Sequence, residues 1–154
     1  MNVGGKGRRD DDDIYNITIN NIKDTSVGSF TIIRLLNHDG IKYNVFISHV
    51  TDTALDGKCK TAQIILIGNE WSYLKKQKNQ PGDTYRIFID NVFTTGQTAI
   101  RIMETFQDSK LTNIACTPLD TKADVLGEKF NNNGVVVLKE EAQLKNVYID
   151  AIQY

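Results

Sequence analysis

The sequence predicts an all-β domain with one or two short helices, arranged as a five-stranded Greek-key barrel. Runs of β-branched and aromatic residues recur along the chain, and stretches rich in Gly, Asn and Asp separate them. One segment, 69–82, has helical features and lies between the third and fourth strand segments. The chain shows neither a parallel βαβ repeat nor a solenoid period, so the order β-β-β-α-β-β favours the barrel.

A loosely alternating segment, 14–22, precedes the three strands predicted before the helix. These strands cover 29–37, 41–53 and 60–68. The second alternates most clearly, whereas the third is a nearly continuous apolar run, as expected for a strand covered on both faces. In the second strand, alternation assigns Tyr43, Val45, Ile47 and His49 to one face and Lys42, Asn44, Phe46 and Ser48 to the other.

The predicted helix begins with Asn69 as a cap and ends at the Pro81-Gly82 pair. We interpret Trp71 as its core anchor rather than as a stacking platform. The fourth strand, 83–93, and the fifth, 98–106, follow the helix. In the fourth strand, alternation predicts that Tyr85, Ile87 and Ile89 point inward and that Arg86 and Phe88 point outward.

The ends of the chain are predicted to lie outside the barrel, which would occupy residues 14–115. Residues 1–13 combine glycines, three cations and four successive aspartates, which predicts a disordered charged arm. Residues 116–154 are predicted to form an extension that packs on the barrel or on a partner. Segment 111–134 is predicted to be loop with one helical turn, and 135–154 to be a short strand followed by either a helix or a second strand.

Length and composition indicate one soluble domain. A chain of 154 residues can bury a core without disulfides or metals, and no apolar run is long enough for a helical membrane span. The N-terminal segment lacks the apolar stretch of a signal peptide, so we expect an intracellular protein. Cys59 and Cys116 have neither disulfide nor zinc-ligand spacing, and we interpret them as single thiols.

Three blocks resemble a known family. YNVFISHVTDT, IILIGNEWSYL and PGDTYRIFIDNVF are similar in kind and order to single-stranded-DNA-binding OB-fold domains, above all those of telomere-end-binding proteins of the protection-of-telomeres type, and then those of replication protein A. In that group an aspartate- and threonine-containing turn ends the second strand, here 50–53, and a Gly-Asp pair opens the fourth, here Gly82-Asp83. The resemblance covers 14–115. The short first connection, 37–40, and the neutral charge balance depart from the family pattern.

The resemblance and the alternation together imply a nucleic-acid-binding face. An outward Phe46 beside a cation and amides suits base stacking, although the ring could instead pack under the arm or the C-terminal segment. Tyr43 matches a stacking position of the family, while its alternation points inward. Arg86 would serve either as a ligand contact or in an ion pair with a neighbouring aspartate. The predicted binding residues are Arg34, His38, Lys42, Tyr43, Asn44, Phe46, Ser48, Lys60, Gln63, Arg86 and Phe88.

The expected function is the non-catalytic binding of single-stranded nucleic acid, DNA with RNA as a possibility, in telomere maintenance, replication or repair in the nucleus. A net charge of −1 implies that stacking and local patches would carry the affinity. No nucleophile or metal motif surrounds either histidine, so neither catalysis nor a cofactor is expected. The alternatives are a protein-interaction OB subunit, docking or dimerising through its C-terminal segment, and a capsid-type structural β-barrel.

Overall fold

The computed structural model describes residues 1–3, 14–25, 31–35, 42–53, 63–68, 84–103, 105–117, 134–138 and 142–153. These residues form ten strands, which alternate along the chain between two sheets. The short sheet contains β1 (Asn2–Val3), β3 (Thr31–Leu35), β5 (Gln63–Ile67), β7 (Thr98–Ile102) and β9 (Gly134–Leu138). The long sheet contains β2 (Ile14–Asp24), β4 (Lys42–Asp52), β6 (Thr84–Thr94), β8 (Phe106–Cys116) and β10 (Leu144–Gln153).

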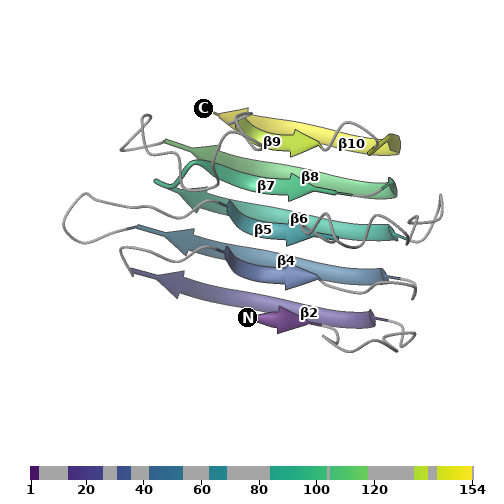
Figure 1. The fold of residues 1–154 in the computed structure, drawn as a ribbon, viewed down its shortest axis with the longest axis horizontal. Helices are drawn as coiled ribbons and strands as arrows, with labels where there is room; N and C mark the ends of the chain where they lie inside the picture. Colours follow the sequence, from purple (N-terminus) through teal and green to yellow (C-terminus); the bar gives the residue numbers. More distant parts are fainter. Residues whose placement is uncertain are drawn as a thin grey trace, which may run out of the picture.

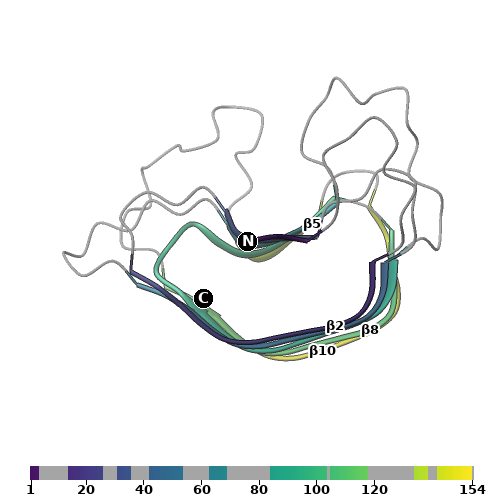
Figure 2. The same cartoon turned by 90° about the horizontal axis from the view of Figure 1, so that it is seen from below.

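The chain coils into a parallel β-solenoid. Every strand pairs in parallel with the strand two places further along, so each pass through both sheets adds one turn to the stack (Figure 1). Viewed along the stack, β2, β8 and β10 superimpose on one bent path and β5 lies on the opposite side (Figure 2). The described residues include no helix with the length and apolarity needed to span a bilayer.

The predicted Greek-key OB-fold barrel is therefore wrong. A Greek key requires antiparallel neighbours, whereas both sheets here are parallel and neither closes on itself. The strand segments themselves were placed well, since 41–53 and 83–93 correspond to β4 and β6. The predicted helix, 69–82, lies outside the described residues. Residues 111–116, predicted to be loop, belong to β8, and the open choice after 138 resolves to the strand β10.

The prediction that the chain has no solenoid period was also wrong. The chain does repeat, but the repeats are irregularly spaced along the sequence. The long strands begin at Ile14, Lys42, Thr84, Phe106 and Leu144, separated by connections of very different length. Once paired, however, they follow one eleven-position pattern in strict register. We call residues that share a position a column. Members of columns one, four, six, nine and eleven point inward, and the others point outward.

Two columns, the third and the eighth, form corners. All their residues have positive φ, between 48° and 59°. A left-handed residue lets two successive side chains point outward, so the strand turns and its alternation shifts by one. Asn dominates these columns because it tolerates this conformation best among residues with a side chain. The corner residues are Asn16, Asn44, Arg86, Asp108 and Asn146 in the third column and Asn21, His49, Asn91, Asn113 and Ala151 in the eighth.

The corners explain where the predicted faces differ from the observed ones. Tyr43 and His49 were grouped with the inward Val45 and Ile47, but each lies on the outside next to or at a corner. Lys42, predicted to point outward, occupies an inward column and is 1% exposed. A strict period of two fails wherever a left-handed residue interrupts the strand.

The core lies between the two sheets and consists mainly of stacked isoleucines. Ile33, Ile65 and Ile100 are paired neighbours in the short sheet and are fully buried. Ile47 and Ile89 face them from the sixth column of the long sheet. Each such side chain contributes about 1.5–3 kcal/mol when it is removed from water.

Cys116 closes the interior at the end of β8. It is a free, buried thiol whose Sγ donates to the carbonyl oxygen of Gly96 at 3.4 Å. This placement agrees with the interpretation of Cys116 as a single thiol, while Cys59 lies outside the described residues.

Candidate ligand-binding face

Aromatic rings form two columns on the outer face of the long sheet. The rings of Tyr15, Tyr43 and Tyr85 stack with centroids 5.3 and 5.4 Å apart and with planes 11° and 5° from parallel. Phe46 and Phe88 stack at 5.0 Å and 12°. These spacings follow from the separation of about 4.7–4.9 Å between paired strands. Such pairs contribute about 0.5–1.5 kcal/mol each beyond the burial of their area.

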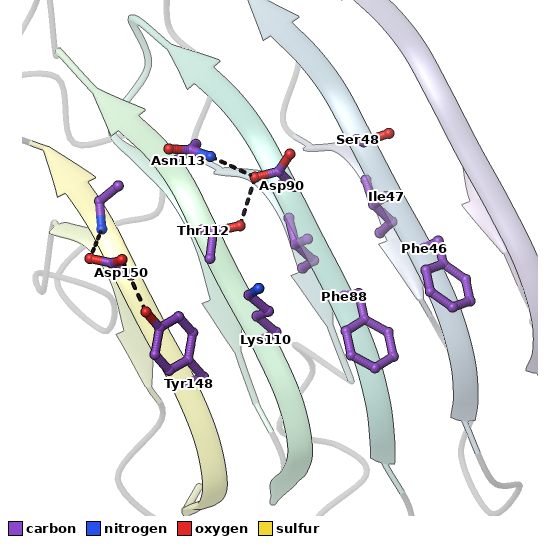
Figure 3. Close-up of a pocket in the computed structure, with 12 residues that line it drawn as sticks. Phe46, Ile47, Ser48, Phe88, Asp90, Lys110, Thr112, Asn113, Tyr148 and Asp150 are labelled. Carbon is purple, nitrogen blue, oxygen red and sulfur yellow. Dashed lines mark hydrogen bonds between the residues drawn. The ribbon is translucent and has the colours of Figure 1, made fainter.

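A shallow depression of about 460 Å³ crosses four strands next to the phenylalanine column. Figure 3 shows Phe46 and Phe88 side by side on neighbouring strands, with Lys110 and Tyr148 continuing their row on β8 and β10. A parallel row of polar side chains follows two positions further along each strand. This polar row consists of Ser48, Asp90, Thr112 and Asp150, with Asn113 beside it.

Asp90 is the best-defined polar group of the depression. Its Oδ1 accepts hydrogen bonds from Thr112 Oγ1 at 2.6 Å and from Asn113 Nδ2 at 2.9 Å. These two bonds, the Thr112 bond foremost, lower the pKa of Asp90 below its ordinary value of 3.8. Asp90 is therefore ionised at neutral pH. Among the described residues none donates a hydrogen bond to its Oδ2.

The other end of the depression combines a ring, a cation and a carboxylate. Tyr148 is 57% exposed, and its hydroxyl donates to Asp150 Oδ2 at 3.1 Å. That bond and the nearby negative charge raise the pKa of Tyr148. The Lys110 ammonium lies 5.4 Å from the centre of the same ring, a cation–π contact. Among the described residues that line the depression, two are carboxylates, Asp90 and Asp150, and one, Lys110, is a cation.

Arg86 lies beside the depression and belongs to the corner ladder. Its Nε donates to Asn44 Oδ1 at 2.6 Å, and Asn44 Nδ2 donates in turn to Asn16 Oδ1 at 3.2 Å. The guanidinium also lies 5.9 Å from the centre of the Phe88 ring. These contacts hold the Arg86 side chain at the surface of the long sheet.

The structure brings together part of the predicted site. Phe46, Ser48 and Phe88 line the depression, and Tyr43, Asn44 and Arg86 lie in adjoining outward columns of the same sheet. Lys42 is buried between the sheets. Arg34 and Gln63 belong to β3 and β5 of the short sheet, and so to a different surface. His38 and Lys60 lie outside the described residues.

Sequence reasoning missed the half of the depression that lies on β8 and β10. The signal was present as a repeated triplet: Phe46-x-Ser48, Phe88-x-Asp90, Lys110-x-Thr112 and Tyr148-x-Asp150 occupy the same two columns. Aligning the irregularly spaced strands would have revealed it.

Comparison of the chain with protein-family models, curated proteins and solved structures gives no match. Within the described residues, no three or more His, Cys, Asp or Glu side chains gather in a way that could hold a metal ion.

Proposed function

We propose that the chain is a binding protein that holds a hydroxyl-rich polymer, an oligosaccharide, across the outer face of the long sheet. The observation that carries this proposal is the depression itself, where a row of three aromatic side chains and Lys110 runs beside a row of hydrogen-bonding groups over four strands. Phe46 is 46% exposed although its ring stacks on Phe88, so part of the ring surface stays available to a ligand.

The two rows suit the two kinds of surface on a sugar. The C–H bonds on one side of a sugar ring form an apolar patch with slight positive charge, which packs on the negative face of an aromatic ring. The hydroxyl groups at its rim donate to carboxylates and exchange hydrogen bonds with amides and hydroxyls, as Asp90, Asn113 and Thr112 would provide.

The charge of the depression favours a neutral ligand over a polyanion. Nucleic-acid binding depends on cations that replace the counterions of the phosphates, whereas Asp90 and Asp150 outnumber Lys110 here. Single-stranded nucleic acid, the ligand expected from the sequence, is the second candidate, and the exposed Phe46 ring with Arg86 near Phe88 favours it.

The lowered pKa of Asp90 does not suit the general-acid role in glycoside hydrolysis. Glycoside hydrolysis requires a carboxyl group that stays protonated until it donates its proton to the leaving group, and such groups have raised pKa values. The hydrogen bonds from Thr112 and Asn113 lower the pKa of Asp90 instead.

The test compares a glycan array with a panel of single-stranded DNA and RNA oligomers. Phe46→Ala is expected to weaken glycan affinity about three- to tenfold, since one stacking surface is lost. Tyr15→Ala is the matched control, because Tyr15 is similarly exposed and stacked but does not line the depression. Its affinity should equal that of the wild type, and both variants should keep their circular-dichroism spectra.

Asp90→Asn separates the two candidate ligands. Removing the negative charge should weaken a sugar that donates hydrogen bonds to the carboxylate, and it should strengthen the binding of a phosphate polymer. Oligonucleotide binding that tightens in this variant, together with no glycan binding by the wild type, would reject the oligosaccharide in favour of nucleic acid.

A further inference from the structure

We infer that copies of this chain stack end to end, with β10 of one copy pairing in parallel with β2 of the next. The inference depends on the two end strands of the long sheet and is independent of the proposed ligand.

β10, the last described strand of the long sheet, has exposed apolar side chains. Within the described residues no strand pairs with the outer edge of β10. Ile149 occupies the sixth, inward column but is 40% exposed, whereas Ile47 and Ile89 in the same column are 1% exposed. Leu144, in the first column, is 36% exposed. Solenoids require their end turns to be covered, because each turn buries its apolar side chains only against its neighbours.

The opposite end offers a matching strand. Among the described strands β2 ends the long sheet, and it follows the same column pattern over eleven residues. Ile14 and Ile19 are already buried there, while Ile17 and Ile22 are only partly buried. Neither β2 nor β10 contains proline, the residue that would block pairing at a free edge.

Parallel stacking in register continues every column across the junction. Ile149 would meet Ile19, so apolar residues face each other inside. Asn146 would meet Asn16 at the third-column corner, where Asn44 and Asn16 already bond within the chain. Asp150 would meet Asn20, an acceptor opposite a donor amide, much as Asp90 accepts from Thr112 in the same column.

Pairing of β10 with a second β10 does not work as well. Such a pair would be antiparallel, and the register that matches inward with inward sets Val147 against Ile149. The corner Asn146 then lies opposite Asp150 rather than opposite the other corner, Ala151. Shifting by one residue aligns the corners but sets the inward Val147 against the outward Asp150. Only head-to-tail stacking satisfies faces and corners together, and such a contact produces open-ended assemblies.

The test measures self-association without ligand by sedimentation velocity, over concentrations from micromolar to millimolar. A wild-type chain of 17.3 kDa should form a series of species whose mass rises with concentration. Ile149→Lys, which places an ammonium in the junction, should leave a monomer.

A gentler pair of variants identifies the register. In Asn20→Asp the side chain keeps the Oδ1 that accepts from Ser48 Oγ, so the fold is preserved, but a carboxylate now faces Asp150 of the next copy. Association should weaken about tenfold through like-charge repulsion. Adding Asp150→Asn to the same chain should restore it.

Three results would overturn the inference. They are a wild-type monomer at every concentration, an assembly that Ile149→Lys leaves intact, and an assembly that Asn20→Asp weakens but Asp150→Asn does not restore. Circular dichroism of each variant shows whether the strands are retained.

Discussion

Asp90 has its chemistry determined by residues from another strand. Thr112 and Asn113 come from β8 and reach Asp90 on β6 only because the two strands pair in register. Their hydrogen bonds stabilise the ionised carboxylate, and this stabilisation exists only in the folded chain.

The lowered pKa of Asp90 predicts a pH-dependent contribution to stability. Because the folded pKa lies below the ordinary 3.8, the contribution is present above that value and is lost as the pH falls through the folded pKa. Thr112→Val removes the stronger bond at nearly constant shape. We expect it to lower the free energy of unfolding at neutral pH by about 0.5–1 kcal/mol after allowance for solvent exposure.

Urea unfolding at neutral pH and at a pH well below 3.8 provides the measurement. The difference between wild type and Thr112→Val should shrink in acid. A difference that stays constant with pH would mean that Thr112 acts through packing and not through the carboxylate.

At the scale of the element, each long strand depends on its two corners. Asn91 occupies an eighth-column corner in β6, with φ of 55° and an exposed side chain. Asn91 should therefore contribute to stability through its backbone conformation rather than through side-chain contacts. Asn91→Ala is expected to cost about 1 kcal/mol, since alanine adopts the left-handed region less readily.

Asn91→Gly is the matched variant, because glycine reaches positive φ without strain and should change stability by no more than about 0.5 kcal/mol. Chemical denaturation measures both. Equal losses for alanine and glycine would show that a side-chain contact of Asn91 matters instead.

The strands also show which parts of the fold could be predicted from the sequence. The position of β4 and β6 was predictable, because β-branched residues at alternate positions mark a strand whatever its partner is. The partner and its direction were not predictable, since a period of two is the same in antiparallel and parallel pairs. The left-handed corner at Asn44 then placed Tyr43 on the outer face, and the corner at His49 did the same for His49 itself.

Only the part of the candidate site that shows in the local pattern of a single strand was predictable. Phe46 and Phe88 stand out as aromatic residues between inward aliphatic ones. The sequence shows that Lys110, Tyr148 and Asp150 belong to the same site only when β8 and β10 are aligned with β6. The uneven connections conceal that alignment from any search for a fixed period.

At the scale of the molecule, a solenoid is stabilised by contacts between neighbouring turns. The same residue should therefore matter differently according to its turn. Ile89, on the inner strand β6, and Ile149, on the outermost described strand β10, share the sixth column but are 1% and 40% exposed. Ile89→Ala should destabilise by about 2–5 kcal/mol, and Ile149→Ala by less than about 1 kcal/mol.

Equilibrium unfolding of both variants at low protein concentration, where self-association is weakest, tests this contrast. Similar losses at the two positions would indicate that the described β10 is covered by other parts of the chain, and that the stack does not end there.

The parallel register also gives the outer face of the long sheet a regular spacing along the stack. Side chains of the same column recur at every strand, at intervals of about 4.7–4.9 Å along the stack, although their residue types differ. A polymer whose own repeat is a simple multiple of that interval places the same part of its repeat against a side chain of the same column each time. A polymer with an unrelated repeat falls out of step after one or two contacts. Selection among ligands of similar chemistry can then depend on whether the repeat length of the polymer matches the strand spacing.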